Sequence, residues 1–90
     1  MPEYLAVGDR VRYADMHKSE TFDARVVGIE VWAPIIGRFL KLPKGDIGVA
    51  WHRLGDNSQG NSVVIFVESL DSPKRSRWGY GGQVLPPLEY

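Results

Sequence analysis

The sequence contains no cysteine. This absence excludes a disulfide framework, a thiolate zinc site and a cysteine nucleophile. A disulfide-free chain of 90 residues fits a reducing compartment, so we expect a cytoplasmic protein. The opening residues, Met-Pro-Glu-Tyr-Leu-Ala, also lack the basic stretch and apolar core of a secretory signal.

Long apolar runs and helical patterns are missing as well. The longest apolar run covers residues 63–67, far below the roughly 18 residues that a membrane-spanning helix needs. No long window has apolar residues at helical spacing. Ten glycines and six prolines instead separate short apolar runs, which is typical of a small barrel or sandwich. The sequence therefore predicts an all-β fold, in one domain over residues 1–90.

The chain also has no excess of charge of either sign, since eleven basic residues balance eleven acidic ones. A neutral chain is unlike a protein whose main task is to coat nucleic acid. It also favours self-association, since little repulsion opposes it. The basic residues are nevertheless concentrated in two segments, residues 38–53 and residues 74–77.

Alternating apolar residues between turn signals predict five main strands. Segments 14–20, 55–61 and 69–82 are polar or glycine-rich and are expected to be loops. A further apolar piece follows Pro34 and contains Phe39, Leu40 and Leu42. The predicted strands cover residues 9–13, 21–32, 47–54, 62–68 and 83–85.

The longest predicted strand changes phase in its middle. Phe22, Ala24 and Val26 alternate first, and Val27, Ile29 and Val31 then alternate in the opposite phase. Because side chains in a strand have a period of two, this change requires a bulge or a sharp bend near Gly28. An antiparallel meander of five short strands with a long bent second strand predicts an SH3-like barrel. An OB-fold is disfavoured, since residues 55–61 are too few for its usual helix.

Two segments carry a resemblance to known families. Residues 7–12, Val-Gly-Asp-Arg-Val-Arg, and residues 24–29, Ala-Arg-Val-Val-Gly-Ile, resemble the opening of SH3-like barrels, including KOW-type modules and plasmid-borne type II dihydrofolate reductases. The closing residues 82–89 look like the last strand of those reductases. The similarity covers both ends of the chain and skips the middle.

The resemblance to the reductases implies an oligomeric enzyme in which four subunits share a pore for folate and NADPH. Gln83 is the pore position that carries over to this chain. Val84 stands where the family has Ile, and Leu85 where it has Tyr, which removes a polar pore contact. The family's pore lysine has no clear match.

Residues 73–80 are the main candidate for a ligand site. Cations beside aromatic rings on a glycine-containing segment are suited to grip a phosphate backbone and stack a base. The alternative is a solvated loop whose rings fold back over the end of the barrel. The candidate ligand residues, with the pore position added, are Lys74, Arg75, Arg77, Trp78, Tyr80 and Gln83.

Other aromatic residues allow two further interpretations. Rings converging at one end of a small barrel can form a cage for methylated ammonium groups. Residues 31–36 are also unusually apolar for a loop and need a cover, either the chain's own core or another molecule. The cage candidates are Tyr13, Trp32, Trp51, Trp78 and Tyr80, and the interface candidates are Trp32, Pro34, Ile35 and Ile36.

The sequence shows no motif typical of catalysis or metal binding. His17 lies near Asp15, but no second cluster with ligand spacing accompanies them, and His52 is expected to face solvent. No nucleophile elbow or phosphate-binding loop is present. We therefore expect a non-enzymatic binding module that needs neither metal nor cofactor, with a protein partner or a second copy of itself. The alternatives are a type II reductase-like oligomer and a nucleic-acid-binding barrel.

Overall fold

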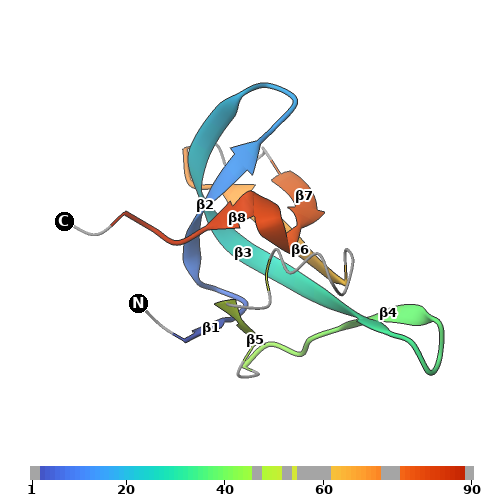
Figure 1. Cartoon of the computed structure of the whole chain (residues 1–90). Coiled ribbons are helices and arrows are strands. Elements are labelled where there is room, and N and C mark those ends of the chain that lie inside the picture. Colours follow the sequence, from blue (N-terminus) through green and yellow to red (C-terminus); the bar gives the residue numbers. More distant parts are fainter. Residues whose placement is uncertain (1–2, 46–47, 52–53, 55–61, 72–75, 89–90) are drawn as a thin grey trace.

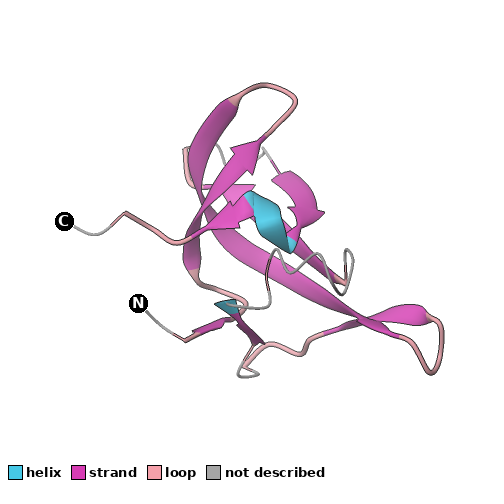
Figure 2. Cartoon of the chain, in the orientation of Figure 1, coloured by secondary structure: helices cyan, strands magenta, loops and turns pink. Residues whose placement is uncertain are grey.

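The fold is all-β. The computed structural model describes residues 3–45, 48–51, 54, 62–71 and 76–88. Strands run through most of them, and a 3-10 turn, η3, precedes the last strand (Figures 1 and 2). No helix within the described residues is long and apolar enough to cross a membrane. The elements are β1 (Tyr4–Leu5), β2 (Arg10–Asp15), β3 (Glu20–Ala33), β4 (Arg38–Lys41), β5 (Val49–Ala50), β6 (Val63–Ser69), β7 (Ser76–Tyr80), η3 (Gly81–Gln83) and β8 (Val84–Leu85).

The strands form two antiparallel sheets. The larger sheet has the order β7-β6-β3-β2-β8, with β4 paired to the far half of β3. The smaller sheet pairs β1 with β5. Among the described residues no ladder joins β7 to β8, so the larger sheet stays open at that point.

Strand β3 bends where the sequence predicts. Its register with β6 shifts between Val26 and Gly28, which leaves Val27 outside the ladder and 46% exposed. Val26 before the shift and Ile29 after it are both buried, so the strand presents apolar side chains to one core across the bulge. Gly28 itself is covered by the ring of Phe66, which lies 3.5 Å from where a Cβ would be. The predicted change of phase is confirmed, although Val27 faces solvent.

The core lies against one face of the larger sheet. Its members are mostly β-branched residues at alternate positions of β2, β3 and β6, the arrangement expected of a sheet with one buried face. Leu5 of β1 and Val49 of β5 extend this core into the smaller sheet. Its largest fully buried side chains are Leu5, Val11, Val26, Ile29, Ile65 and Val67.

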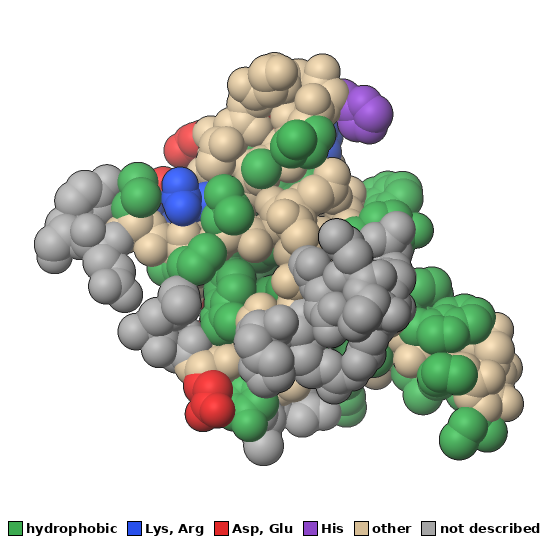
Figure 3. All heavy atoms as spheres, viewed as in Figure 1, with side chains coloured by type: hydrophobic (Ala, Val, Ile, Leu, Met, Phe, Trp, Pro, Cys, Tyr) green, Lys and Arg blue, Asp and Glu red, His purple; other side chains and the backbone are tan. Residues whose placement is uncertain are grey.

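Strands β3 and β4 form a hairpin that projects from the rest of the molecule (Figure 1). Its turn ends at Gly37, which has a positive φ of 63° and donates its amide to the carbonyl of Ala33. Hydrophobic side chains gather over this hairpin (Figure 3). Ile35 at the tip is fully exposed, and the rings of Trp32 and Phe39 pack edge to face with centroids 5.2 Å apart.

Three sequence predictions of the elements need correction. The described residues form eight strands rather than five. The strand expected over 47–54 is reduced to Val49–Ala50, because the chain turns at Trp51, whose carbonyl accepts a hydrogen bond from the amide of Leu54. Segment 69–82 was expected to be a loop, yet it contains β7 and most of η3. The predicted loop 55–61 lies outside the described residues.

Candidate binding site on strand β7

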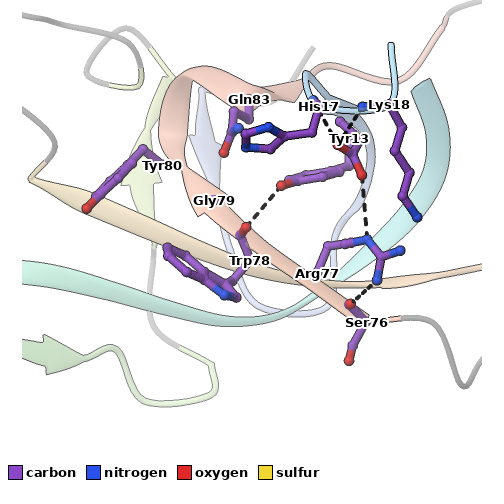
Figure 4. Close-up of a pocket in the computed structure, with 10 residues that line it drawn as sticks. Tyr13, His17, Lys18, Ser76, Arg77, Trp78, Gly79, Tyr80 and Gln83 are labelled. Carbon is purple, nitrogen blue, oxygen red and sulfur yellow. Dashed lines mark hydrogen bonds and ion pairs between the residues drawn. The ribbon is translucent and has the colours of Figure 1, made fainter. Parts of the chain in front are cut away.

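A pocket of about 670 Å³ lies between β7, η3 and the turn that joins β2 to β3 (Figure 4). Six of the residues that line it come from the C-terminal part of the chain, namely residues 76–80 and Gln83. The other four, Tyr13, Asp15, His17 and Lys18, come from β2 and the turn after it. The pocket therefore joins two segments that are some 60 positions apart in the sequence.

The outward side of β7 carries two exposed aromatic rings. Trp78 pairs with Phe66 of the neighbouring strand and Tyr80 with Val64, so these side chains share the outer face of the sheet. Trp78 is 61% exposed and Tyr80 is 39% exposed. The two rings are nearly perpendicular, at 80°, with centroids 6.4 Å apart. They form a corner that offers flat apolar surface to a ligand.

The inward side of β7 carries Arg77 and Gly79 instead of apolar side chains. These residues pair with Val67 and Ile65, which are buried in the core. Because β7 ends the sheet, the Arg77 side chain reaches the open edge and contacts Asp15 rather than entering the core. In Figure 4, Arg77 lies on one side of the β7 ribbon and Trp78 on the other.

Asp15 organises the cationic side of the pocket. One carboxylate oxygen, Oδ1, accepts hydrogen bonds from the backbone amides of His17 and Lys18 at 3.1 and 3.3 Å. The other, Oδ2, lies 3.6 Å from Nε of Arg77. Burial by itself would raise the pKa of Asp15, but the two amide hydrogen bonds and the charges of Lys18 and Arg77 outweigh it, and the pKa lies below its ordinary value. Asp15 is therefore ionised at neutral pH.

Tyr13 links β2 to β7 underneath the pocket. Its hydroxyl donates a hydrogen bond of 3.0 Å to the backbone carbonyl of Trp78. The side chain is buried, and this burial, together with the negative charge of Asp15, raises the pKa of the phenol, while Arg77 opposes the change. The phenol therefore stays protonated and remains a donor.

Gly79 is the residue that allows this close approach. A Cβ at position 79 would overlap the side-chain amide of Gln83 and would come within 2.9 Å of the Tyr13 hydroxyl oxygen. The Gln83 amide is the end of a flexible side chain and can move aside, but the Tyr13 hydroxyl is held by its hydrogen bond to Trp78. The glycine thus lets η3 and β2 pack directly against the backbone of β7.

The charges of the pocket favour an anion. Lys18 and Arg77 are cationic, and Asp15 is the one carboxylate among the lining residues. A ligand that combines negative charge with a flat ring would match the cations on one side of β7 and the rings on the other. Within the described residues, no group of three or more His, Asp or Glu side chains could hold a metal ion.

Most of the predicted ligand residues lie together. Arg77, Trp78, Tyr80 and Gln83 all line the pocket, whereas Lys74 and Arg75 fall outside the described residues. Gln83, expected in the last strand, ends η3 instead. The four interface candidates lie on the β3–β4 hairpin, where Trp32 contributes to a separate pocket of about 360 Å³.

The five cage candidates do not converge on one site. Tyr13, Trp78 and Tyr80 share the β7 pocket, but the Tyr13 ring is buried. Trp32 lies on the hairpin, and Trp51 packs against the core. His52 lies outside the described residues.

Sequence reasoning missed the contribution of β2 and its turn to the site. The sequence predicts a polar loop for His17, with Asp15 and His17 as the alternative start of a metal site, and it predicts no role for Lys18. The available signal was local, since an aspartate that accepts amides two and three residues ahead is a common turn device. Its proximity to Arg77 depends on the strand order, which spacing does not reveal.

Comparisons of the chain with protein-family models, with curated proteins and with solved structures gave no match.

Proposed function

We propose that this chain is a small non-enzymatic binding module that takes its ligand in the β7 pocket. The observation that carries the proposal is the exposure of Trp78 at the rim of a pocket that also contains Arg77, Tyr80 and Gln83. A tryptophan that is 61% exposed leaves apolar surface in water, and such surface beside convergent polar groups is typical of a binding site.

The architecture that we propose is an SH3-like barrel that stays open along one seam. Four strands follow one another as neighbours, β2, β3, β6 and β7, and β8 returns to pair with β2. The 3-10 turn η3 makes this return, and the bulge in β3 lets that strand serve both halves of the sheet. Near this seam, the hydrogen bond from Tyr13 of β2 to the carbonyl of Trp78 holds β7 to the β2–β8 side of the sheet.

The contacts of two ionisable groups in the pocket, Asp15 and Tyr13, favour binding over catalysis at these positions. Asp15 is held by two backbone amides and by Arg77, and the Tyr13 hydroxyl is committed to a backbone carbonyl. A general base or nucleophile needs a proton-accepting atom directed at a substrate. These two groups instead maintain the shape of the pocket.

A second surface supports self-association. The β3–β4 hairpin exposes Trp32, Ile35 and Ile36, which are 40%, 100% and 53% exposed, away from the β7 pocket. We propose that a second copy or a protein partner covers this hairpin, since the neutral chain offers little charge repulsion against association.

The binding proposal can be tested by the indole N–H signals in a nitrogen-15 NMR spectrum. The chain contains three tryptophans, of which Trp78 lies in the pocket and Trp32 on the hairpin. We expect at least one of three probes, a mononucleotide, an acidic peptide or a trimethyllysine peptide, to shift the Trp78 signal and leave the Trp32 signal in place. If these three probes and a single-stranded oligonucleotide all leave the Trp78 signal unchanged, the pocket is not a ligand site.

A further inference from the structure

The outer face of β6 and β7 extends the aromatic surface beyond the pocket. Phe66 of β6 lies directly opposite Trp78 in the ladder, so their side chains are neighbours on the same face. Phe66 is half-buried over Gly28, and Tyr80 follows Trp78 two residues along the strand, on the same side. Three rings thus lie on the outer face of two neighbouring strands, and we call Phe66, Trp78 and Tyr80 together the aromatic platform. Trp78 and Tyr80 form its corner at the β7 pocket, while Phe66 lies over Gly28 at the edge of a separate pocket.

The opposite side of the β7 ribbon carries positive charge. The contact with Asp15 uses Nε of Arg77, and Nη1 donates to the carbonyl of Ser76 at 2.9 Å, so the guanidinium is held in place. Its Nη2 atom carries two further N–H donors. Lys18 also lines the pocket. Its backbone amide donates a hydrogen bond to Asp15, which holds the backbone from which the Lys18 side chain extends.

We propose that the ligand of this site is a single-stranded nucleic acid, with bases stacked on the aromatic platform and phosphates directed at Arg77 and Lys18. The inference rests on the proposed function of the pocket and names its ligand class. A single strand carries flat bases on one side of its sugar backbone and negative charge on the other. The β7 edge, with rings on one side and cations on the other, has the matching arrangement.

Two other ligand classes fit this arrangement less well. A methylated ammonium group would meet two cations and a carboxylate that is already occupied by backbone amides and Arg77. An acidic peptide would satisfy Arg77 and Lys18 but would leave the rings of Phe66, Trp78 and Tyr80 without stacking partners. A DNA duplex keeps its bases stacked in the helix, so the platform has no open base to receive.

The test is a fluorescence anisotropy titration with a labelled oligothymidylate of about ten nucleotides, within the usual range of site sizes. An abasic strand of the same length has the same phosphates without bases, and a duplex of the same length has paired bases. We expect the oligothymidylate to bind at least about tenfold more tightly than either control, since each stacked base contributes to affinity. Equal binding of the abasic strand or of the duplex would overturn the inference.

Two matched pairs of variants locate the contact. Trp78→Ala is expected to weaken binding about 5- to 150-fold, the usual effect of losing one stacking ring. Tyr4→Ala, which removes another exposed ring outside the β7 pocket, is expected to leave affinity unchanged. Lys18→Gln should reduce the slope of log affinity against log salt concentration by about 0.7, the value for one phosphate contact on a single strand. Lys44→Gln, which also removes one exposed cation but lies outside the pocket, should leave the slope nearly as it is. Equal effects within either pair would place the strand elsewhere on the surface and overturn the inference.

Failure of this inference and failure of the binding proposal give different results. If the oligothymidylate does not bind while an acidic peptide or a trimethyllysine peptide shifts the Trp78 indole signal, the ligand class is wrong and the pocket remains a binding site. If none of these probes, the oligothymidylate included, shifts that signal, both proposals are wrong.

Discussion

The hydroxyl of Tyr13 donates a hydrogen bond to the backbone carbonyl of Trp78, across 65 positions of sequence and near the open seam of the sheet. Tyr13 belongs to β2 and Trp78 to β7, two strands that do not pair. The bond fixes the backbone of β7 below the residue whose side chain forms the platform. The contact therefore links the stability of the sheet to the position of Trp78 in the proposed binding site.

Replacing Tyr13 by phenylalanine should destabilise the fold. The change keeps the buried ring and removes the hydrogen bond, which leaves the Trp78 carbonyl without its donor. We expect the free energy of unfolding to fall by about 1 kcal/mol and the melting temperature by about 4–8 °C. Tyr4→Phe removes a hydroxyl from an exposed ring and should change the unfolding free energy by less than about 0.5 kcal/mol. Equal urea unfolding curves for both variants would show that the bond does not stabilise the seam.

Asp15 should make the free energy of unfolding depend on pH in the acid range. Its pKa in the folded chain lies below the ordinary value of 3.8, so its contribution is present above that pH and is lost as the pH falls through the lower folded pKa. Wild type should be more stable than Asp15→Asn at neutral pH, and the two urea midpoints should converge in strong acid. Asp23→Asn alters an exposed pair with Arg10 and serves as a control that keeps the acid dependence of Asp15. A constant difference between wild type and Asp15→Asn at every pH would contradict the assignment.

Gly48 should tolerate substitution less well than Gly37. Both have positive φ, 95° and 63°, so alanine is strained at either site, at a cost of about 1–2 kcal/mol. A Cβ at position 37 meets open space, but one at position 48 would overlap the backbone carbonyl of Leu5. We expect Gly48→Ala to cost a further 1–3 kcal/mol or so, because the β1–β5 pairing would have to move. Calorimetric melting of the two variants measures the difference, and equal melting temperatures would disprove the close packing.

The β3–β4 hairpin should determine whether the chain self-associates in solution. Light scattering during size-exclusion chromatography is expected to give a mass above the 10.1 kDa of a single chain. Ile35→Asp should return the mass to that of one chain, because a charge at the fully exposed tip would be buried in the interface. Leu88→Asp changes another exposed apolar residue outside the hairpin and should not alter the mass. A wild-type mass of 10.1 kDa at high concentration would remove self-association from the proposal.

The reductase-like alternative has a direct test. A ligand that binds the folded chain raises its melting temperature by mass action. For a non-enzymatic module, we expect millimolar NADPH to leave the melting temperature unchanged. A rise that Gln83→Ala abolishes would instead favour the shared-pore enzyme over the binding module.

The bent strand was predictable because it follows from a strong local rule. Apolar residues at positions 22–26 and 29–31 can share a core only if one residue is inserted, and Val27 is that residue. The run of β-branched residues that became β6 was equally clear. The bend and strand β6 both follow from burial of alternate side chains, which is visible in the sequence as the spacing of apolar residues.

Strand β7 was not predictable by the same rule because its polarity is inverted. Trp78 and Tyr80 face outward, while Arg77 and Gly79 face inward, so the pattern lacks a buried apolar face. Inverted patterns of this kind arise where a strand serves a site instead of the core. The residue types of the site could be identified from the sequence, but their pairing with Asp15 and Tyr13 depends on the order of strands in the sheet.

The charges on β4 have a consequence for how copies of this chain can meet. Within the described part of the chain, β4 pairs with β3 on one side only, so its other edge is available to a neighbour. Antiparallel pairing of two such edges about a twofold axis between Phe39 and Leu40 would set Arg38 of each copy against Lys41 of the other. Like charges directly opposite one another weaken a strand pair, and charged residues at an edge are a known protection against open-ended sheets. The hairpin can thus associate through its apolar side chains, while the charges at the two ends of β4 discourage edge-to-edge pairing that would extend into a fibre.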